Sequence, residues 1–387
     1  MRYKLGEIFN LQMGKTPDRH SPKFWNEGTE PWISIADLTK CIKYIENTAE
    51  KITATAVDES GIKIIPKNTV IMSFKLSIGK VAITPKEIYS NEAIMSFIDK
   101  GVLKIEPVYL YYLLMHKDWD TGTNKAVMGK TLNKASLSQM TVNIHGYSEQ
   151  LEIIKVLDAA SSIIAARKQQ LTELDNLIKA RFVELFGMPG TDAFGWGLVP
   201  LGSTCNINPK KSLDSRLVSG AVVSFVPMPA VTEHGEIDAT AIKEYDEVKT
   251  GFTYFAENDV LFAKITPCME NGKGAVAKGL HNGIGFGSTE FHVLRPISGK
   301  TDPYWIYTLT AFSQFRMDAA SNMTGSAGQR RVPASFLENY RVSLPPIALQ
   351  EQFAAFVKQT DKSKVAIQKA LDEAQLLFDS LMQKYFG

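Results

Sequence analysis

The chain has 387 residues, of which 44% are hydrophobic and 22% are charged, and its formal net charge is +2. This length suits two domains of ordinary size, and the composition excludes a disordered chain. No apolar stretch approaches the roughly 18–20 residues that a membrane helix needs, and no signal-peptide run opens the chain. We therefore expect a folded cytoplasmic protein.

In chain order, each half begins with a segment of mixed α+β character. Four segments, 69–74, 80–85, 259–265 and 290–296, are rich in β-branched or aromatic residues and are bounded by turn formers, which predicts strands. Segments 107–116 and 303–317 each start with a proline, which favours the first turn of a helix. Glycine and proline elsewhere predict loops, above all over 271–287.

A seven-residue repeat of apolar side chains marks a long helix at the end of each half. The stripe of segment 148–187 consists of Leu157, Ile164, Leu171, Ile178 and Leu185. Segment 347–387 repeats it 200 residues later with Val357, Leu371, Phe378 and Tyr385, and with Lys364 as its one charged member. Neither segment contains proline or an internal glycine, so the spacing predicts two coiled-coil helices.

The duplication extends beyond the helices. Leu5-Gly6 matches Leu201-Gly202, the stretch from Gly61 to Val70 matches that from Gly251 to Val260, and the Pro107 helix matches the Pro303 helix. Glu149-Gln150 matches Glu351-Gln352, which implies a slip of two residues near the helix start. Between these matched segments the two halves differ in sequence, which predicts a shared scaffold with different intervening segments. The predicted domains are 1–147 and 188–346, and the helices are 148–187 and 347–387.

Three short runs and the duplicated order resemble a known family. The runs are Leu5–Glu7, Pro31–Ile35 and Pro345–Gln352, the last entering a long helix. The first half departs from the pattern, because Ile144-His145-Gly146 stands where the second half has Leu344-Pro345-Pro346. The sequence resembles the specificity subunits of type I restriction–modification systems, in which a recognition domain and a helix occur twice.

The resemblance implies both architecture and function. It implies an α+β fold with two target-recognition domains separated by two long helices, which form an antiparallel coiled coil with a pseudo-two-fold repeat. Each domain would read one half of a bipartite, asymmetric double-stranded DNA site. The helices would dock two adenine methyltransferase subunits, and motor–nuclease subunits would join the complex. S-adenosylmethionine, ATP and magnesium are then expected on partner subunits, with no cofactor on this chain.

The residues themselves are consistent with that function. Two equivalent units on a rigid rod suit two half-sites, because unit spacing must match half-site spacing. A helix of roughly 35 residues spans about 50 Å, or about 15 base pairs of B-DNA. Two alternatives remain: a free-standing DNA methyltransferase or nuclease, and a coiled-coil scaffold without direct DNA readout.

Candidate DNA contacts are polar or basic residues in expected loops, since base edges and phosphates are bound by such side chains. They are Lys15, Thr16, Arg19, Lys75, Lys80, Asn124, Lys125, Lys130, Asn133, Lys134, Lys210, Lys211, Lys264, Lys273, Gln329, Arg330 and Arg331. The best pair of loops is Gly129–Leu132 and Gly328–Arg331, which are basic, begin with glycine and lie 199 residues apart. Each of these residues taken singly also fits ordinary solvated surface.

No catalytic or metal site is predicted. The three cysteines are scattered, and the six histidines never reach a metal-ligand spacing such as HxxxH. Asn124–Thr131 resembles a phosphate-binding loop but lacks its first glycine, and we expect no nucleotide there. Asp302–Trp305 resembles the Asp-Pro-Pro-Tyr motif of amino-methyltransferases, but it is more simply a helix cap followed by proline.

Overall fold

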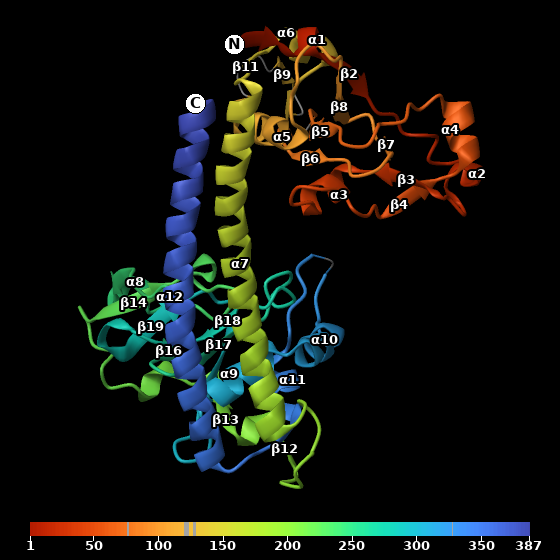
Figure 1. The fold of residues 1–387 in the computed structure, drawn as a ribbon. Helices are drawn as coiled ribbons and strands as arrows, with labels where there is room; N and C mark the ends of the chain where they lie inside the picture. Colours follow the sequence, from red (N-terminus) through yellow and green to blue (C-terminus); the bar gives the residue numbers. More distant parts are fainter. Residues whose placement is uncertain (76, 120–123, 127–128, 327) are drawn as a thin grey trace. The chain divides into compact units, whose positions relative to one another are not determined.

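The computed structural model describes residues 1–387 except 76, 120–123, 127–128 and 327, and the chain forms two compact units (Figure 1). Unit 1 comprises Met1–Ala166 and Ala370–Gly387, and unit 2 comprises Arg167–Lys369. Each unit contains sheets, short helices and part of both long helices, α7 (Tyr147–Phe186) and α12 (Ile347–Phe386). The predicted α+β class with two long helices is confirmed.

The main sheet of unit 1 has four antiparallel strands in the order β2-β8-β5-β6. These are β2 (Phe9–Met13), β8 (Ile94–Asp99), β5 (Val70–Ser73) and β6 (Val81–Ile83). Helix α5 (Pro107–His116) packs on this sheet, and its Tyr109 and Leu113 share a core with Met72 and Phe97. The strands predicted over 69–74 and 80–85 are thereby confirmed.

The remaining elements of unit 1 form a second sheet, two strand pairs and short helices. The second sheet contains β4 (Glu50–Ile52), β3 (Glu30–Ile33) and β7 (Tyr89–Ser90). The pairs are β1 (Arg2–Lys4) with β11 (Thr141–Asn143), and β9 (Asn124–Ala126) with β10 (Gly129–Thr131). The helices are α1 (Leu5–Ile8), α2 (Pro22–Trp25), α3 (Ile35–Lys40), α4 (Ala54–Ser60) and α6 (Lys134–Gln139).

Unit 2 contains two four-stranded sheets and one strand pair. The first sheet has the order β13 (Cys205–Ile207), β20 (Phe291–Pro296), β17 (Val260–Ala263) and β18 (Gly274–Val276). The second has the order β15 (Ile242–Glu244), β14 (Val222–Val226), β19 (Ile284–Gly287) and β16 (Thr253–Ala256). Strand β12 (Leu198–Pro200) pairs with β21 (Arg341–Ser343).

The helices of unit 2 are short apart from the two long ones. They are α8 (Tyr245–Val248), α9 (Pro303–Ala311), α10 (Ser313–Ser321) and α11 (Ala334–Asn339), with 3-10 turns η1 (Leu201–Ser203), η2 (Lys211–Leu213), η3 (Met228–Ala230) and η4 (His281–Gly283). The single helix predicted over 303–317 is wrong. Phe312 has extended backbone angles and breaks it, which places the Phe312 ring 5.2 Å from that of Phe182 on α7.

The loop predicted over 271–287 is also wrong, because it contains β18 and β19. Three of its glycines have positive φ values in turns, whereas Gly274, Gly285 and Gly287 lie in strands, where they allow close packing. A Cβ at Gly274 would lie 2.8 Å from the Leu261 carbonyl oxygen, and one at Gly285 would lie 2.1 Å from the Phe255 ring. Glycine in a strand can mark such a close approach of a neighbouring group.

The two units repeat the same topology. The sheet β13-β20-β17-β18 of unit 2 has the strand order of β2-β8-β5-β6 in unit 1, and each unit also holds one parallel strand pair, β3–β7 or β14–β19. Asn68 and Asn258 occupy matching turns, with φ values of 57° and 68° in the left-handed region. The pseudo-repeat predicted from the sequence is therefore present in the fold.

A buried glutamine joins each long helix to its domain. The side-chain oxygen of Gln150 accepts a hydrogen bond from the Glu106 amide (3.1 Å), and that of Gln350 accepts one from the Asp302 amide (2.9 Å). Their amide groups donate to two carbonyls each, Lys104 and His145 for Gln150, and Lys300 and Pro345 for Gln350. Gln150 thus matches Gln350 and not Gln352, so the predicted two-residue slip is wrong.

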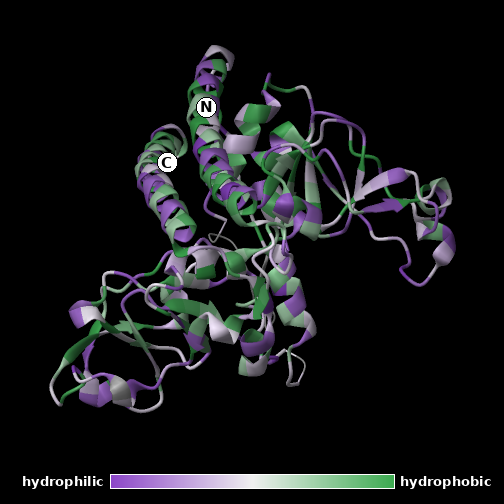
Figure 2. Cartoon of the chain, turned by 90° about the horizontal axis from the view of Figure 1, so that it is seen from below, coloured by the Kyte–Doolittle hydropathy of each residue, from purple (hydrophilic) through white to green (hydrophobic). Residues whose placement is uncertain are grey.

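Within each unit, α7 and α12 pack through apolar side chains from opposite ends of the two helices. In unit 1, Ile153 and Leu157 from the start of α7 share a core with Met382 near the end of α12. In unit 2, the Phe182 ring near the end of α7 lies 5.6 Å from that of Phe353 near the start of α12. The helices are therefore antiparallel in each unit, and Figure 2 shows apolar and polar residues alternating along them.

Candidate nucleic-acid interface

In unit 2 a short hairpin lies against the end of strand β17. Thr324 and Arg331 exchange two backbone hydrogen bonds of 3.0 and 2.8 Å, and the next residue, Val332, donates its amide to the Lys264 carbonyl (2.9 Å). The Lys264 amide donates to the Glu290 carbonyl at the start of β20 (2.9 Å). The predicted loop with Arg330 and Arg331 is thus brought next to Lys264.

The arginines of this hairpin are held by carboxylates. Arg331 forms a bidentate pair with Glu290, with Nη2–Oε1 at 2.7 Å and Nε–Oε2 at 2.9 Å. Arg330 Nη2 lies 3.6 Å from Glu270 Oε1. The hydrogen bonds from Arg331 lower the pKa of Glu290, and the nearby Lys264 contributes. We call Lys264, Glu290, Arg330 and Arg331 the unit 2 cluster.

Buried His292 contacts the backbone directly after the hairpin. Its Nε2 lies 2.8 Å from the Val332 carbonyl oxygen, and its Nδ1 lies 3.0 Å from Asn208 Nδ2. Burial lowers the pKa of His292, which favours the neutral ring at neutral pH. The spacing of the histidines in the sequence gives no sign of this supporting role.

The equivalent hairpin of unit 1 is β9–β10. Its register places Lys130 opposite Lys125, and Leu132 just beyond it donates its amide to the Phe74 carbonyl (3.1 Å), as Val332 does to Lys264. The two loops predicted as a pair therefore occupy the same place in the repeat. The side chains of Asn124, Lys125 and Lys130 lie outside the described part of the structure.

Close to that place in unit 1, Glu92 lies beside Thr16 and within the electrostatic influence of Lys75 and Arg19. The Thr16 hydroxyl donates to the Glu92 carboxylate. Burial opposes the shift, but this hydrogen bond and the positive charges of Lys75 and Arg19 lower the pKa of Glu92. We call these four residues the unit 1 cluster. Neither Glu92 nor Glu290 is among the predicted contacts, which are basic, amide or hydroxyl side chains.

Aromatic rings fix the position of Arg19. Its guanidinium carbon lies 4.0 Å from the centre of the Trp25 ring and 4.7 Å from that of Trp32. Glu50 pairs with the same guanidinium, and the Trp32 indole N–H donates to the Lys15 carbonyl (3.2 Å). Arg19 remains 45% exposed and is held in place by its neighbours.

Other candidates have different local partners. Asn133 caps α6 by accepting the Ser136 amide (2.8 Å), and exposed Lys134 starts that helix. The remaining lysine contacts are as follows: Lys15 to the Ser60 carbonyl, Lys80 to Thr39 Oγ1, Lys211 to the Lys249 carbonyl and Lys273 to the Met228 carbonyl. Lys210 and Gln329 are exposed.

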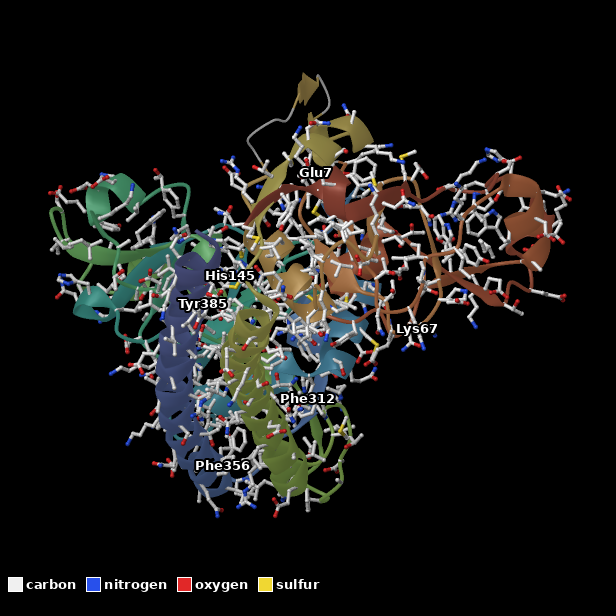
Figure 3. The ribbon with its side chains drawn as sticks, turned by 45° about the horizontal axis from the view of Figure 1, so that its top comes forward. Glu7, Lys67, His145, Phe312, Phe356 and Tyr385 are labelled. Carbon is white, nitrogen blue, oxygen red and sulfur yellow. The ribbon has the colours of Figure 1, made fainter. Side chains whose placement is uncertain are left out.

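Of the predicted helix-pairing residues, Tyr385 is labelled in Figure 3, near the C-terminal end of α12. Leu157, Ile178, Val357 and Leu371 are buried, whereas Ile164, Leu171, Leu185, Phe378 and Tyr385 are half-buried. Tyr385 packs against the core of unit 1. Lys364, the charged member of the stripe, pairs with Asp175 of α7 in unit 2.

The motifs that resembled enzyme signatures have structural explanations. Asp302 accepts the Tyr304 amide (2.8 Å) and caps α9 ahead of Pro303, which confirms the predicted cap. The 124–131 segment contains the paired strands β9 and β10 instead of the strand–loop–helix of a phosphate-binding loop. Burial raises the pKa of Cys41 to about 11 and that of Cys205 to about 12, so neither thiol is activated as a nucleophile.

Among the described residues, no three His, Cys, Asp or Glu side chains gather as a metal site. In the same part of the chain, no helix has the length and apolar character needed to cross a membrane.

Comparison with known proteins decides the family. The sequence profile described as the type I restriction modification DNA specificity domain matches residues 1–176 and 195–375, one stretch in each half. The chain belongs to this family. The resemblance found in the sequence is confirmed.

Relatives within the family cover different shares of the chain. The type I restriction enzyme EcoEI specificity subunit of Escherichia coli is 38% identical over 193 residues, which are 49% of this chain and 32% of that protein. This chain therefore matches about a third of that relative's length. The MjaIX specificity subunit of Methanocaldococcus jannaschii is 22% identical over 411 residues, with 98% of this chain and 91% of that protein covered.

Two solved structures share the fold over the whole chain. The type I restriction–modification S subunit from M. genitalium has a TM-score of 0.53 and 14% identity, with 100% of this chain and 96% of that one covered. A chain from a structure on complex assembly and conformational transition of the type I R-M system has a TM-score of 0.55 and 17% identity, with coverages of 100% and 97%. Both similarities establish the fold.

Proposed function

We propose that this chain reads a bipartite, asymmetric DNA site, with each unit contacting one half-site. The observation that carries the proposal is the matched placement of two hairpins, β9–β10 in unit 1 and the one closed by Thr324 and Arg331 in unit 2. A hairpin leads into the same strand end in both halves, yet the side chains there differ. Equivalent scaffolds with different reading groups suit two different half-site sequences.

The long helices are proposed to dock two methyltransferase subunits, with motor–nuclease subunits joining that core. The support comes from apolar side chains left in solvent. On the part of α7 in unit 1, Leu151 and Ile163 are 44% and 48% exposed, and on that of α12, Leu376 and Leu377 are 73% and 53% exposed. Contiguous exposed apolar surface is typical of a site that a partner protein covers, and we propose that these side chains form such a surface.

The chain itself is proposed to be non-catalytic. Methyl transfer and cleavage would belong to the partners, which would bind S-adenosylmethionine, ATP and magnesium. Two observations support this proposal. Burial raises the pKa values of Cys41 and Cys205, which disfavours a reactive thiolate, and Asp302 serves as a helix cap.

A DNA-binding titration over a range of salt concentrations tests the proposal. The purified chain is measured alone and with its methyltransferase subunits, on duplexes with and without the modified site. Preferential, salt-dependent binding of the complex to the site supports the proposal. Binding without sequence preference would favour a scaffold, and methyl transfer by the chain alone would favour a free-standing methyltransferase.

A further inference from the structure

A carboxylate stands at nearly the same place in the two clusters. Glu290 directly precedes β20, and Glu92 lies two residues before the matching strand β8. The Lys264 amide donates to the Glu290 carbonyl (2.9 Å) and the Phe74 amide donates to the Ala93 carbonyl (3.0 Å), so Glu290 corresponds to Ala93 and Glu92 lies one residue earlier. Surfaces that bind DNA phosphates are positively charged, so an acidic group within each cluster requires an explanation.

In unit 2 the carboxylate restrains an arginine. Arg331 gives its Nε and Nη2 hydrogens to Glu290, and its Nη1 donates to the Gln329 carbonyl (3.1 Å). The side chain of Arg331 is still 42% exposed, and that of Glu290 is 24% exposed. The Arg331 guanidinium is therefore partly exposed to solvent while its hydrogen bonds to Glu290 fix its orientation.

In unit 1 the same kind of group restrains a hydroxyl. Glu92 accepts the Thr16 hydroxyl and lies in the field of Lys75 and Arg19. Arg19 itself is held by Glu50 and by the rings of Trp25 and Trp32. Each cluster thus combines an exposed arginine, Arg19 or Arg330, with a carboxylate that is exposed or partly exposed.

A carboxylate acts differently on the two kinds of DNA contact. It repels phosphate oxygens and competes with them for a neighbouring arginine, which weakens sequence-independent binding. It also accepts hydrogen bonds from the amino group of cytosine, while arginine donates to guanine. We propose that Glu290 and Glu92 are specificity-determining residues, which keep the adjacent donors from phosphates and favour base contacts. This rests on the proposed function.

The test uses the complex of this chain with its methyltransferase subunits. Affinity is measured against salt for a duplex with the recognised site and for one of equal length without it. Glu290→Gln removes the charge and releases Arg331 to contact a phosphate. The slope of log affinity against log salt on the second duplex then steepens by about 0.9, the value for one more phosphate contact. The ratio of the two affinities falls.

Three further variants make the result specific. Glu290→Asp keeps the charge and retains the wild-type slope, and Glu290→Gln combined with Arg331→Ala removes the added slope. Glu247→Gln is the matched control, because Glu247 also pairs with a basic residue of unit 2, Lys243 at 3.6 Å, but lies on α8. It leaves both the slope and the ratio unchanged.

Glu92→Gln lowers the same affinity ratio through the other half-site. If Glu290→Gln leaves the slope and the ratio unchanged while the wild-type complex prefers its site, the role of Glu290 is disproved and the proposed function stands. If the wild-type complex shows no preference for any site, the proposed function itself fails.

Discussion

Lys364 of α12 forms an ion pair with Asp175 of α7 inside the apolar stripe of unit 2. Both side chains are largely covered, with 20% and 29% of their surfaces exposed. Asp175 is also 3.4 Å from Nδ1 of His234, and Asp361 lies 3.9 Å from Lys364. The one charged residue that interrupts the predicted heptads therefore has a partner on the facing helix.

This pair selects the helix register in unit 2. Sliding one helix by a heptad would place Lys364 opposite Lys168 or Phe182, where it would meet a like charge or a buried ring. A polar residue in a coiled-coil stripe commonly fixes register at some cost in stability. The sequence pattern alone showed Lys364 as a misfit, because its partner belongs to a distant segment.

Asp175→Ala is expected to destabilise the protein by about 1–2 kcal/mol, since it leaves the Lys364 ammonium partly buried with one weaker partner. Replacing both residues by leucine is expected to restore most of this loss, because an apolar pair fits the stripe. Urea unfolding of the variants measures both effects. Lys362→Ala, which changes an exposed neighbour, stays within about 0.5 kcal/mol of wild type. A double variant as unstable as Asp175→Ala would contradict the account.

The buried glutamines support a second stability prediction. Gln350→Ala removes three hydrogen bonds and leaves the Asp302 amide and two carbonyls without their partner, so we expect a loss of about 1–3 kcal/mol. Gln150→Ala has the same effect in unit 1. Gln352→Ala serves as control, because Gln352 is exposed and is expected to cost under about 0.5 kcal/mol. Equal effects at Gln350 and Gln352 would contradict the repeat alignment.

Asp302 gives a pH prediction. Burial raises the pKa of Asp302 to about 6, although Lys358 and Lys278 partly oppose the shift. The folded state therefore binds a proton more tightly than the unfolded state, whose pKa is near 3.8. This contribution to stability is complete below pH 3.8 and is lost as pH rises through 6. Asp302→Asn keeps the cap and removes the titration.

The stability of wild type relative to Asp302→Asn is measured by thermal unfolding between pH 4 and 7. We expect wild type to lose stability relative to Asp302→Asn as pH rises through this range. A constant difference would mean that the Asp302 pKa is not shifted.

The hairpins give a prediction on DNA binding. Arg330→Ala and Arg331→Ala should each weaken binding, by about 1–3 kcal/mol where the side chain contacts a base edge. Lys130→Ala should affect the other half-site. Each variant is titrated with duplexes that carry changes in one half-site only. If none of them lowers affinity or alters base preference, these residues are ordinary surface.

Local patterns predicted the elements whose signals are contained within a few residues. The heptads gave both long helices, β-branched runs gave β5, β6, β17 and β20, and Asp302-Pro303 gave a cap. Patterns failed where a distant group decides the conformation. Phe312 breaks a helix to meet Phe182, and Gly274 is required by the Leu261 carbonyl across a sheet.

The candidate interface was predictable in part for the same reason. Matching the two halves located both hairpins, because the repeat can be recognised in the amino-acid sequence. The carboxylates that hold Arg330 and Arg331 were not found, since Glu270 and Glu290 lie 60 and 41 residues away in the sequence. Side chains that pair across a sheet edge are far apart in the sequence, so their pairing is recognised only in the three-dimensional structure.

Methylome sequencing of a strain that expresses the chain with its methyltransferase subunits tests the central proposal most directly. Wild type is compared with a variant carrying Arg330→Ala and Arg331→Ala. We expect modified adenines within a split motif, and in the variant we expect the base preference to relax in one half of that motif while the other half is unchanged. A continuous motif, or equal relaxation of both halves, would contradict two independent reading units.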